Sequence, residues 1–300
     1  MNSGSFHSGE LRAQHLAGGG ASGAGIRDFM PDQHRKFFAL LPAIFVSVPD
    51  EDGWPVAAIL TGAPGFVSSP DAGTLQIAAT VIAPDPTAGL FRAAQSVGVL
   101  GLDFSTRRRN RANGVIVQAD AAGFTVAVAE SFGNCAKYIQ TRQIRTFETD
   151  PGQFEEMTGL DADAVSLIRS SDTFFVASGA ANTQPGGMDI SHRGGRPGFV
   201  QVSGNELIIP DFSGNRYFNT FGNLLIEPRA SLLFIDFDTG DVLRLKGTAS
   251  IDWSPPNTSP AGTERVLRFQ TSKISRQRSA LPLRWDFAEF SPASLATGVW

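Results

Sequence analysis

Short runs of apolar residues, often alternating with polar ones, recur along this chain between clusters of glycine, proline, asparagine and aspartate. The runs are rich in β-branched and aromatic residues, a composition that predicts β-strands. They cover 43–48, 74–79, 98–104, 114–119 and 124–131 in the first half, and 173–178, 198–202, 206–210, 231–237 and 242–251 in the second. The turn residues at 203–205 and 238–240 predict hairpins between neighbouring strands.

One helix is expected among the strands of each half. In the first half, Asp85 followed by Pro86 has the order of an N-cap and a first helical residue. In the second half, five apolar residues share one face of a helix that ends before Pro228, namely Tyr217, Phe218, Phe221, Leu224 and Leu225. Several strands with one helix, without regular strand–helix alternation, predict a mainly β fold with a small barrel in each half. A sandwich is the alternative architecture.

The motif G-x-P-G-F-V occurs twice, from Gly62 to Val67 and from Gly195 to Val200, at an offset of 133 residues. The same offset places 101–114 on 234–247. There Asp103, Phe104, Thr106, Arg111 and Gly114 fall on Asp236, Phe237, Thr239, Arg244 and Gly247. We interpret the chain as a tandem duplication of a unit of roughly 120 residues, which is a normal domain size. Two such units can pack as a pseudo-dimer about a pseudo-twofold axis.

This interpretation divides the chain into four segments. Residues 1–30 form an N-terminal segment with a short helix and a mobile Gly-rich linker, and 31–148 form the first repeat. Residues 149–171 form an acidic linker with one helix, and 172–300 form the second repeat.

Composition narrows the function classes. Of the 300 residues 42% are hydrophobic and 18% charged, as in a globular protein, and the net charge of −4 gives no reason to expect nucleic acid or an anionic membrane as partner. The single cysteine, Cys135, excludes an intrachain disulfide and a cysteine-based zinc site, and no metal site is expected. The first 30 residues lack the apolar core of a signal peptide. The longest apolar stretch, 37–48, is too short to span a bilayer. We therefore expect a cytoplasmic protein.

The predicted helix of the second half has polar residues opposite its aromatic face. They are Arg216, Asn219, Thr220 and Asn223, and no carboxylate is among them. Ser213, Gly214 and Asn215 come directly before, where free backbone N–H groups favour an anion. This pattern indicates either a phosphate site, with Arg216 as a further donor, or a structural helix cap.

The segment "DISHRGG" (189–195) is expected to be extended, with Ser191 and Arg193 on one face and Ile190 and His192 on the other. The first copy has Ile59, Leu60 and Thr61 at the positions of His192, Arg193 and Gly194. This divergence predicts that the second copy binds a ligand and that the first, apolar copy supports it. A lone histidine is more often a structural hydrogen-bonding residue than a catalytic one.

The residues of 189–243, "DISHRGGRPGFV…IPDFSGNRYFNTFGNLLIEPRASLLFIDFDTGDVL", resemble the pyridoxamine 5′-phosphate oxidase-like family of FMN-binding split barrels, and in particular its long, duplicated bacterial members. Four further blocks are similar, at 6–14, 30–42, 101–114 and 131–142. The resemblance implies a six-stranded split barrel, usually dimeric, with FMN between two barrels. It implies that Ser191, His192 and Arg193 bind FMN from a strand. Pro210 and Asp211 would lie by the flavin ring, with Asn215, Arg216, Asn219 and Thr220 around the phosphate.

Two departures limit what the resemblance implies. Asn219 and Thr220 stand where the oxidase has an Arg-Lys pair, and no convincing copy of its pyridoxal-phosphate-binding residues is present. Vitamin B6 oxidation is therefore not inherited from the fold. The first hypothesis is an FMN-dependent oxidoreductase of a small molecule, with a separate nicotinamide or reductase as electron donor. The alternatives are a non-enzymatic flavin- or haem-handling protein, with His192 as axial ligand, and a deazaflavin-dependent reductase.

Two basic segments of the first half are further candidates for the site. The cluster "TRRRNR" (106–111) is interpreted as structural ion pairs or as a rim of the flavin site across the pseudo-twofold axis, in preference to a nucleic-acid patch. Lys137, Tyr138 and Arg142 could close over a ligand, and Cys135 is interpreted as structural. The sequence leaves open whether two chains form a homodimer.

Overall fold

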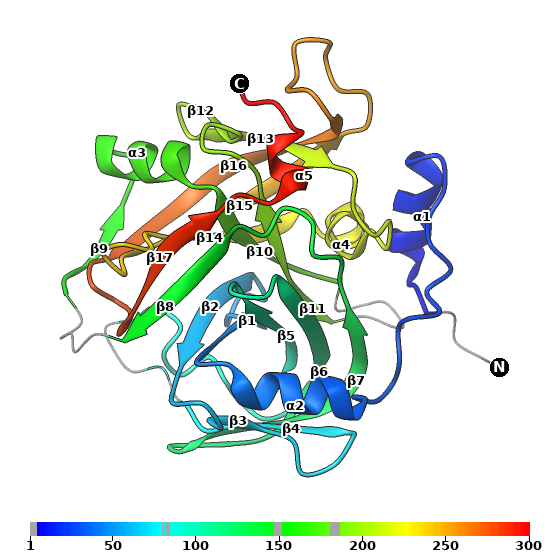
Figure 1. The fold of residues 1–300 in the computed structure, drawn as a ribbon, viewed down its shortest axis with the longest axis vertical. Helices are drawn as coiled ribbons and strands as arrows, with labels where there is room; N and C mark the ends of the chain where they lie inside the picture. Colours follow the sequence, from blue (N-terminus) through cyan, green and yellow to red (C-terminus); the bar gives the residue numbers. More distant parts are fainter. Residues whose placement is uncertain (1–4, 80, 82–84, 147–151, 181–186) are drawn as a thin grey trace.

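The computed structural model describes residues 5–79, 81, 85–146, 152–180 and 187–300. Two antiparallel sheets hold most of this part of the chain (Figure 1). The first contains β1 (Ala43–Pro49), β2 (Pro55–Thr61), β3 (Val67–Ser68), β4 (Thr74–Ile77), β5 (Ser96–Asp103), β6 (Arg108–Asp120) and β7 (Gly123–Gly133). The second contains β10 (Thr173–Gly179), β11 (Met188–Gly194), β12 (Gln201–Ser203), β13 (Glu206–Phe212), β14 (Arg229–Ile235), β15 (Val242–Asp252) and β16 (Thr263–Gln277), and β9 (Phe154–Met157) pairs with β16.

The two sheets have the same strand order. It is β2-β1-β5-β6-β7-β4-β3 in the first and β11-β10-β14-β15-β16-β13-β12 in the second, so each strand has one counterpart. β8 (Thr141–Thr146) and β17 (Leu283–Glu289) pair with each other in a separate ribbon. The predicted fold class, mainly β with two barrels in tandem, is confirmed.

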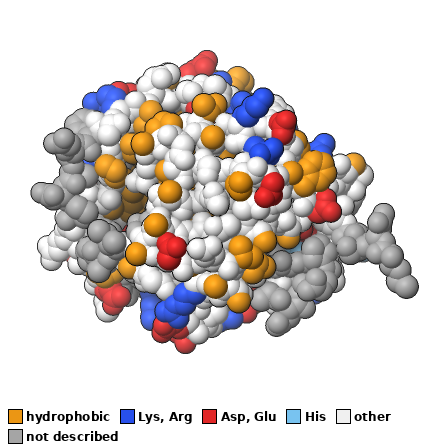
Figure 2. Space-filling view, turned by 90° about the horizontal axis from the view of Figure 1, so that it is seen from below, with side chains coloured by type: hydrophobic (Ala, Val, Ile, Leu, Met, Phe, Trp, Pro, Cys, Tyr) orange, Lys and Arg blue, Asp and Glu red, His pale blue; other side chains and the backbone are white. Residues whose placement is uncertain are grey.

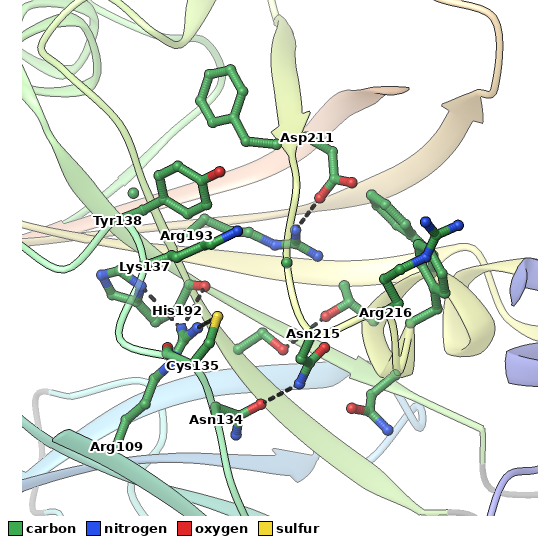
Figure 3. A pocket seen from close by; sticks show the side chains of 18 of the residues that line it. Arg109, Asn134, Cys135, Lys137, Tyr138, His192, Arg193, Asp211, Asn215 and Arg216 are labelled. Atoms are coloured by element: carbon green, nitrogen blue, oxygen red, sulfur yellow. Dashed lines mark hydrogen bonds and ion pairs between the residues drawn. The ribbon is translucent and has the colours of Figure 1, made fainter. Parts of the chain in front are cut away.

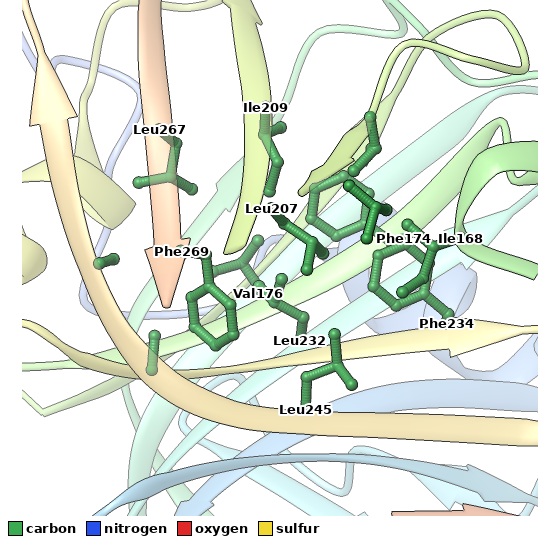
Figure 4. Close-up of a cluster of buried hydrophobic side chains, with 14 of the residues drawn as sticks. Ile168, Phe174, Val176, Leu207, Ile209, Leu232, Phe234, Leu245, Leu267 and Phe269 are labelled. Atoms are coloured by element: carbon green, nitrogen blue, oxygen red, sulfur yellow. The ribbon is translucent and has the colours of Figure 1, made fainter. Parts of the chain in front are cut away.

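Each barrel has its own apolar core. The core of the second barrel is built from inward-facing residues of its strands, among them Phe174, Leu207, Leu245 and Phe269 (Figure 4). The first barrel has a corresponding cluster around Ile44, Leu75 and other residues of β1 to β7. Alternating inward-facing residues on every strand explain why the hydrophobic pattern predicted the strands.

A third apolar cluster joins the two barrels. The rings of Phe45 and Phe175 stack with their centroids 3.6 Å apart, and Phe104 meets Phe237 edge-on at 5.4 Å. Phe104 and Phe237 are related by the offset of 133 residues, and Phe45 and Phe175 hold the same place in β1 and β10. Equivalent residues touch each other in this way at a twofold axis. The barrels therefore pack as a pseudo-dimer.

Two helices hold equivalent places before the barrels. α2 (Asp32–Leu40) precedes β1 just as α3 (Ala162–Ser170) precedes β10. Ala164 and Ile168 of α3 belong to the core of the second barrel. The helix expected in the segment 149–171 therefore packs against the second barrel.

The helix predicted at Asp85 and Pro86 is wrong. Described residues 85–89 form turns, and residues 80 and 82–84 lie outside the described part. The Asp85 carboxylate accepts from the backbone N–H of Thr87 at 2.8 Å, and Gly89 has a φ of +75°. A local carboxylate–backbone bond and a left-handed glycine favour a turn over a continued helix.

The helix of the second half is confirmed, but α4 (Asn219–Ile226) begins later than the pattern predicts. Arg216 and Phe218 have φ values of +61° and +62°, which are incompatible with a helix. Arg216 and Tyr217 therefore lie in the connection before α4.

The short N-terminal helix is also confirmed, as α1 (Ser8–Leu16), and it lies beside α4 (Figure 1). The following segment was predicted to be a mobile linker. In the structure it is attached to the loop before α4, because the Arg216 guanidinium donates to the carbonyls of Ala17 and Gly19 at 2.9 and 2.8 Å. α5 (Pro292–Leu295) is a single turn near the C-terminus.

Figure 2 shows charged side chains of both signs in small groups among hydrophobic and neutral ones on one face of the molecule. Among the helices of the described residues, none is long and apolar enough to cross a membrane.

Candidate functional site

A pocket of about 850 Å³, including the space open to solvent, lies between the two barrels (Figure 3). The second barrel lines it with residues of β11, β13 and α4, and the first barrel with residues of β6 and of the segment 134–138. All nine predicted site residues are in the lining, namely Ser191, His192, Arg193, Pro210, Asp211, Asn215, Arg216, Asn219 and Thr220.

The first barrel was predicted only to support the site, yet it contributes part of the wall. Arg109 and Arg111 reach across from β6, as the rim interpretation of 106–111 anticipates, and Asn134, Lys137 and Tyr138 line the wall beyond β7. The pseudo-twofold packing brings β6 against β11, so these residues belong to the same site as "DISHRGG".

A polar network occupies the end of the pocket near α4. The Arg111 guanidinium donates to the Ser191 hydroxyl at 2.8 Å and forms an ion pair of 2.8 Å with Asp189. Thr220 donates to Ser191, also at 2.8 Å, and Asn219 accepts from Arg111 at 3.3 Å. All but Asn219 are at least nine-tenths buried. This end of the pocket is pre-formed to hold polar ligand atoms.

A second cationic group surrounds Asp211. Its carboxylate pairs with Arg193 on one side and with Arg265 on the other, the latter at 2.7 Å. The guanidiniums lie over aromatic rings, Arg193 over Phe221 at 5.0 Å and Arg265 over Phe218 at 4.9 Å. One carboxylate thus faces two guanidiniums on an aromatic floor, a surface that suits a flat ring carrying acceptor atoms.

Arg109 and His192 form the third part of the wall. Nη1 of Arg109 lies 3.3 Å from Nδ1 of His192, and Nε donates to the carbonyl of Cys135 at 2.9 Å. A guanidinium only donates, so Nδ1 accepts and the imidazole proton resides on Nε2. Burial, followed by the nearby Arg109, holds the pKa of His192 well below its ordinary value, so the ring is neutral.

This arrangement does not suit an axial haem ligand. Nε2 of His192 is buried and has no hydrogen-bond partner among the described residues, and it carries the proton that a metal bond would replace. The described residues also contain no group of three side chains placed to hold a metal ion.

Arg216 lines the pocket, but its guanidinium does not face into it. It donates to Ala17 and Gly19 on the side of the pocket opposite Tyr138 (Figure 3). The left-handed backbone at Arg216 turns the side chain toward the N-terminal segment. The Arg216 guanidinium is thus held by the N-terminal segment, and a contact between it and a phosphate stays a prediction.

The remaining predicted residues have various partners. Asn215 donates to Asn134 at 2.8 Å across the two barrels, and Tyr138 donates to the Ser213 carbonyl at 3.0 Å. Lys137 is exposed at the mouth. Arg142 does not reach the pocket wall, because it forms a buried ion pair with Asp172. Lys137 and Tyr138, but not Arg142, are therefore placed to contact a ligand.

Hydrogen-bond donors outnumber acceptors in the pocket wall, and this balance is the basis for asking whether FMN fits the pocket. Among the described lining residues are six cations and one carboxylate. Nε of Arg111, Nε of Arg193 and Nδ2 of Asn134 are buried without a partner. Buried donors without a partner are normally satisfied by acceptor atoms of a ligand or of water. A phosphorylated flavin, which is rich in acceptors and dianionic at one end, fits this donor set.

In the other half, the counterpart of Arg111 is paired within the protein. Arg244, the counterpart of Arg111, donates to the Asp85 carboxylate at 2.6 Å and to the Ala57 carbonyl at 3.4 Å. Ala58 stands where the other half has Ser191. Both halves thus have the arginine, as Arg111 and Arg244, but only the second half has the polar strand, β11.

Comparisons with known proteins find partial likenesses only. No protein-family model matches the chain, and no curated protein matches it. Among solved structures, HupZ from Group A Streptococcus is 14% identical and matches 38% of this chain and 91% of its own, with a TM-score of 0.30. A putative pyridoxamine 5′-phosphate oxidase from Lactobacillus delbrueckii is 12% identical, with 39% and 94% covered and a TM-score of 0.32. An FMN-binding protein from Syntrophomonas wolfei is 16% identical, with 37% and 81% covered and a TM-score of 0.28. Because these scores are low, the proposal below rests on the geometry of the pocket.

Proposed function

We propose that the pocket between the barrels binds FMN and that the protein is an FMN-dependent oxidoreductase acting on a small molecule. The observation that carries this proposal is the charge of Arg109. Among the described residues, no carboxylate lies within ion-pair distance of its guanidinium. An unneutralised cation inside a pocket with five further cations favours an anionic ligand.

The pKa of Arg109 supports the same conclusion. The pKa of Arg109 is lowered to about 10, by burial first and also by Arg111 and Arg193, while the neighbouring Cys135 acts in the opposite direction. The guanidinium stays charged at neutral pH, and a bound phosphate would relieve its repulsion with the other cations. Arg109 and Arg111, with the hydroxyls of Ser191 and Thr220, would hold the phosphate.

The other wall of the pocket would hold the ring. Pro210, Phe212, Phe218 and Tyr138 offer apolar surface, and Arg193 offers a donor at the ring edge. Bound FMN supplies hydride or electron transfer. His192 is neutral with its proton on Nε2, so in this site it acts as a hydrogen-bond donor rather than as a base. The substrate and a separate electron donor, a nicotinamide or a reductase, would approach from the open mouth at Lys137.

The test is the visible absorption spectrum of the purified protein, with the released chromophore identified by mass. We expect flavin bands in the absorption spectrum and FMN as the released chromophore. Arg109→Gln is expected to weaken FMN binding roughly tenfold to a hundredfold, the value of a hydrogen bond to a charged group. The matched control is Arg108→Gln, because Arg108 neighbours it in β6 but is exposed and lies over the Phe37 ring.

Three outcomes would contradict the proposal. A Soret band would indicate haem, release of a deazaflavin would change the cofactor, and a colourless protein that does not take up FMN would remove the basis of the oxidoreductase assignment. Equal FMN affinities of the Arg109 and Arg108 variants would show that the phosphate lies elsewhere.

A further inference from the structure

Helix α1 crosses α4 at two glycines. A Cβ atom on Gly9 would lie 2.2 Å from the carbonyl oxygen of Gly222, and a Cβ on Gly222 would lie 2.6 Å from Cα of Glu10. Both distances are too short for any side chain, so the two backbones are in direct contact. The N-terminal segment is therefore seated on the helix that forms one wall of the pocket (Figure 1).

A chain of hydrogen bonds runs from α1 into the pocket. His7 caps α1, and its Nε2 lies 3.0 Å from the Asn223 side chain. The Glu10 carboxyl accepts from the backbone N–H of His7 at 2.8 Å and, through its other oxygen, from the side-chain amide of Asn219. Asn219 in turn accepts from Arg111, which bonds to Ser191 in the pocket. Glu10 thus orients Asn219 and, through it, Arg111.

The surroundings of Glu10 carry a marked excess of negative charge. Glu10 lines a cavity of about 310 Å³ together with Glu130 of β7 and Asp189 of β11. The cation next to these carboxylates is Arg111 of β6, which pairs with Asp189 at 2.8 Å. His7 adds no positive charge near neutral pH, because burial lowers its pKa. Asn113, Asn219 and Asn223 complete the polar lining. A charged Glu10 would therefore be buried beside two further carboxylates, at 5% side-chain exposure.

We propose that α1 is a pH-responsive clamp on the ligand pocket and that Glu10 is its positioning residue. When Glu10 is protonated, α1 stays on α4 and holds Asn219 and Arg111 in place for an anionic ligand. When Glu10 loses its proton, the docked position becomes unfavourable and α1 separates from α4 more readily. The effect on the ligand rests on the proposed FMN site, whereas the effect on α1 itself does not.

The pH range follows from the docked state. Burial raises the pKa of Glu10 to about 7, with Glu130 and Asp189 acting in the same direction, while the hydrogen bonds from His7 and Asn219 oppose the shift. In an undocked α1 the carboxyl would return toward its ordinary pKa of 4.5. Because the pKa is higher when docked, docking is strongest below pH 7 and weakens as the pH rises through 7. The docking equilibrium falls by about tenfold between pH 6 and pH 8.

The first arm of the test is amide hydrogen exchange of residues 8–16 at pH 6 and pH 8, corrected for intrinsic exchange rates. In the native chain we expect about tenfold lower protection at pH 8. Glu10→Gln cannot titrate, so its protection should be equal at the two pH values. Glu51→Gln is the matched control, because Glu51 is exposed and pairs with Arg92 far from α1, and it should behave as the native chain.

The second arm is FMN affinity, measured by quenching of flavin fluorescence at the same two pH values. The FMN phosphate itself titrates near pH 6 and changes the affinity of every variant with pH. The clamp is therefore tested by the difference between the native chain and Glu10→Gln. The native affinity should fall between pH 6 and pH 8 by up to tenfold more than that of Glu10→Gln. Gly9→Val wedges α1 away from α4 and should weaken FMN binding at both pH values, whereas Leu11→Val, on the exposed face of α1, should not.

Equal protection of 8–16 at the two pH values in the native chain, or native pH dependence in Glu10→Gln, would overturn the clamp. If FMN does not bind at either pH, the proposed function fails, and the exchange measurement alone still decides whether α1 responds to Glu10. If amide exchange of 8–16 depends strongly on pH but FMN affinity changes with pH equally in the native chain and in Glu10→Gln, the link between α1 and the pocket is refuted.

Discussion

Replacing Arg111 by methionine would separate two effects that the same side chain has in this structure. Arg111 forms an ion pair with Asp189 at 2.8 Å, with both side chains at most 5% exposed. It also stands in the pocket wall. Its counterpart Arg244 pairs with Asp85 at 2.6 Å, with side-chain exposures of 5% and 15%, and does not line this pocket. Arg244→Met is therefore an internal control with nearly the same chemistry.

Both variants leave a carboxylate without its guanidinium. Breaking a buried ion pair by removing one partner costs about 3–5 kcal/mol. At roughly 2–4 °C per kcal/mol for a chain of this size, the melting temperature should fall by roughly 6–20 °C. Arg244→Met should lie at the lower end, because Asp85 is more exposed than Asp189 and water can solvate it.

Thermal unfolding by circular dichroism and FMN titration at a temperature where both variants are folded make up the assay. We expect both variants to be less stable and only Arg111→Met to bind FMN at least tenfold more weakly, as the loss of a charged hydrogen bond requires. Equal loss of FMN in both variants would show a general effect of destabilisation. Unchanged FMN affinity in Arg111→Met would refute the placement of the phosphate beside Arg111.

Three further predictions concern the framework around the site. Phe45→Ala should lower the free energy of unfolding by about 3–5 kcal/mol, measured by urea denaturation, and Phe175→Ala should do the same because the two rings stack on each other. Asp161→Ala should cost about 0.5–2 kcal/mol at pH 7, because Asp161 caps α3. The pKa of Asp161 is lowered by the Ala164 N–H and by Arg276, so this contribution should be full above the ordinary pKa of 3.8, decrease below it, and be lost as the pH falls through the lower pKa of the folded state. A variant that is weakened at pH 3 as much as at pH 7 would contradict the role of the ionised carboxylate. Gly222→Ala should detach α1, seen as loss of amide protection in 8–16, and unchanged protection would show that the helices can separate slightly without undocking.

The strands were predictable because each has one face in a barrel core. The period-two pattern of 206–210, for example, places Leu207 and Ile209 inward, and both are almost fully buried. The identical residues at an offset of 133 indicated two copies, and the equal strand orders agree with that interpretation. The local hydrophobic pattern was sufficient to predict an element wherever burial of the apolar residues in that pattern stabilises it.

The helix starts were less predictable, because backbone conformation at single residues decides them. The sequence from 217 to 225 has an apolar face with helical spacing, yet positive φ at Arg216 and Phe218 delays α4 until Asn219. Non-glycine residues in the left-handed region are held there by tertiary contacts, here the bonds of Arg216 to Ala17 and Gly19. A pattern confined to one segment contains no information about such distant contacts.

The nine site residues were predicted because they are close together in two segments of the second repeat, and all of them line one pocket. Arg265 was missed, since it stands far from those segments in the sequence. The contribution of Arg109 could be anticipated only by applying the pseudo-twofold axis, which places the first repeat's β6 opposite the second repeat's β11. Whether these residues bind FMN remains a prediction for the spectrum to test.

The tandem arrangement of two barrels in one chain explains how one half of a symmetric architecture can be polar and the other apolar. In a homodimer every substitution appears at both sites, so a change that fills one pocket fills the other as well. In a tandem chain the two positions mutate independently. Ala58 and Leu60 now stand where the other half has Ser191 and Arg193, and Asp85 neutralises the Arg244 that a ligand would otherwise meet. On that side the arginine is neutralised within the protein, whereas the pocket on the other side has six cations and one carboxylate among its described lining residues. On this argument the chain should bind one FMN, not two, and a titration that reaches two equivalents would refute it.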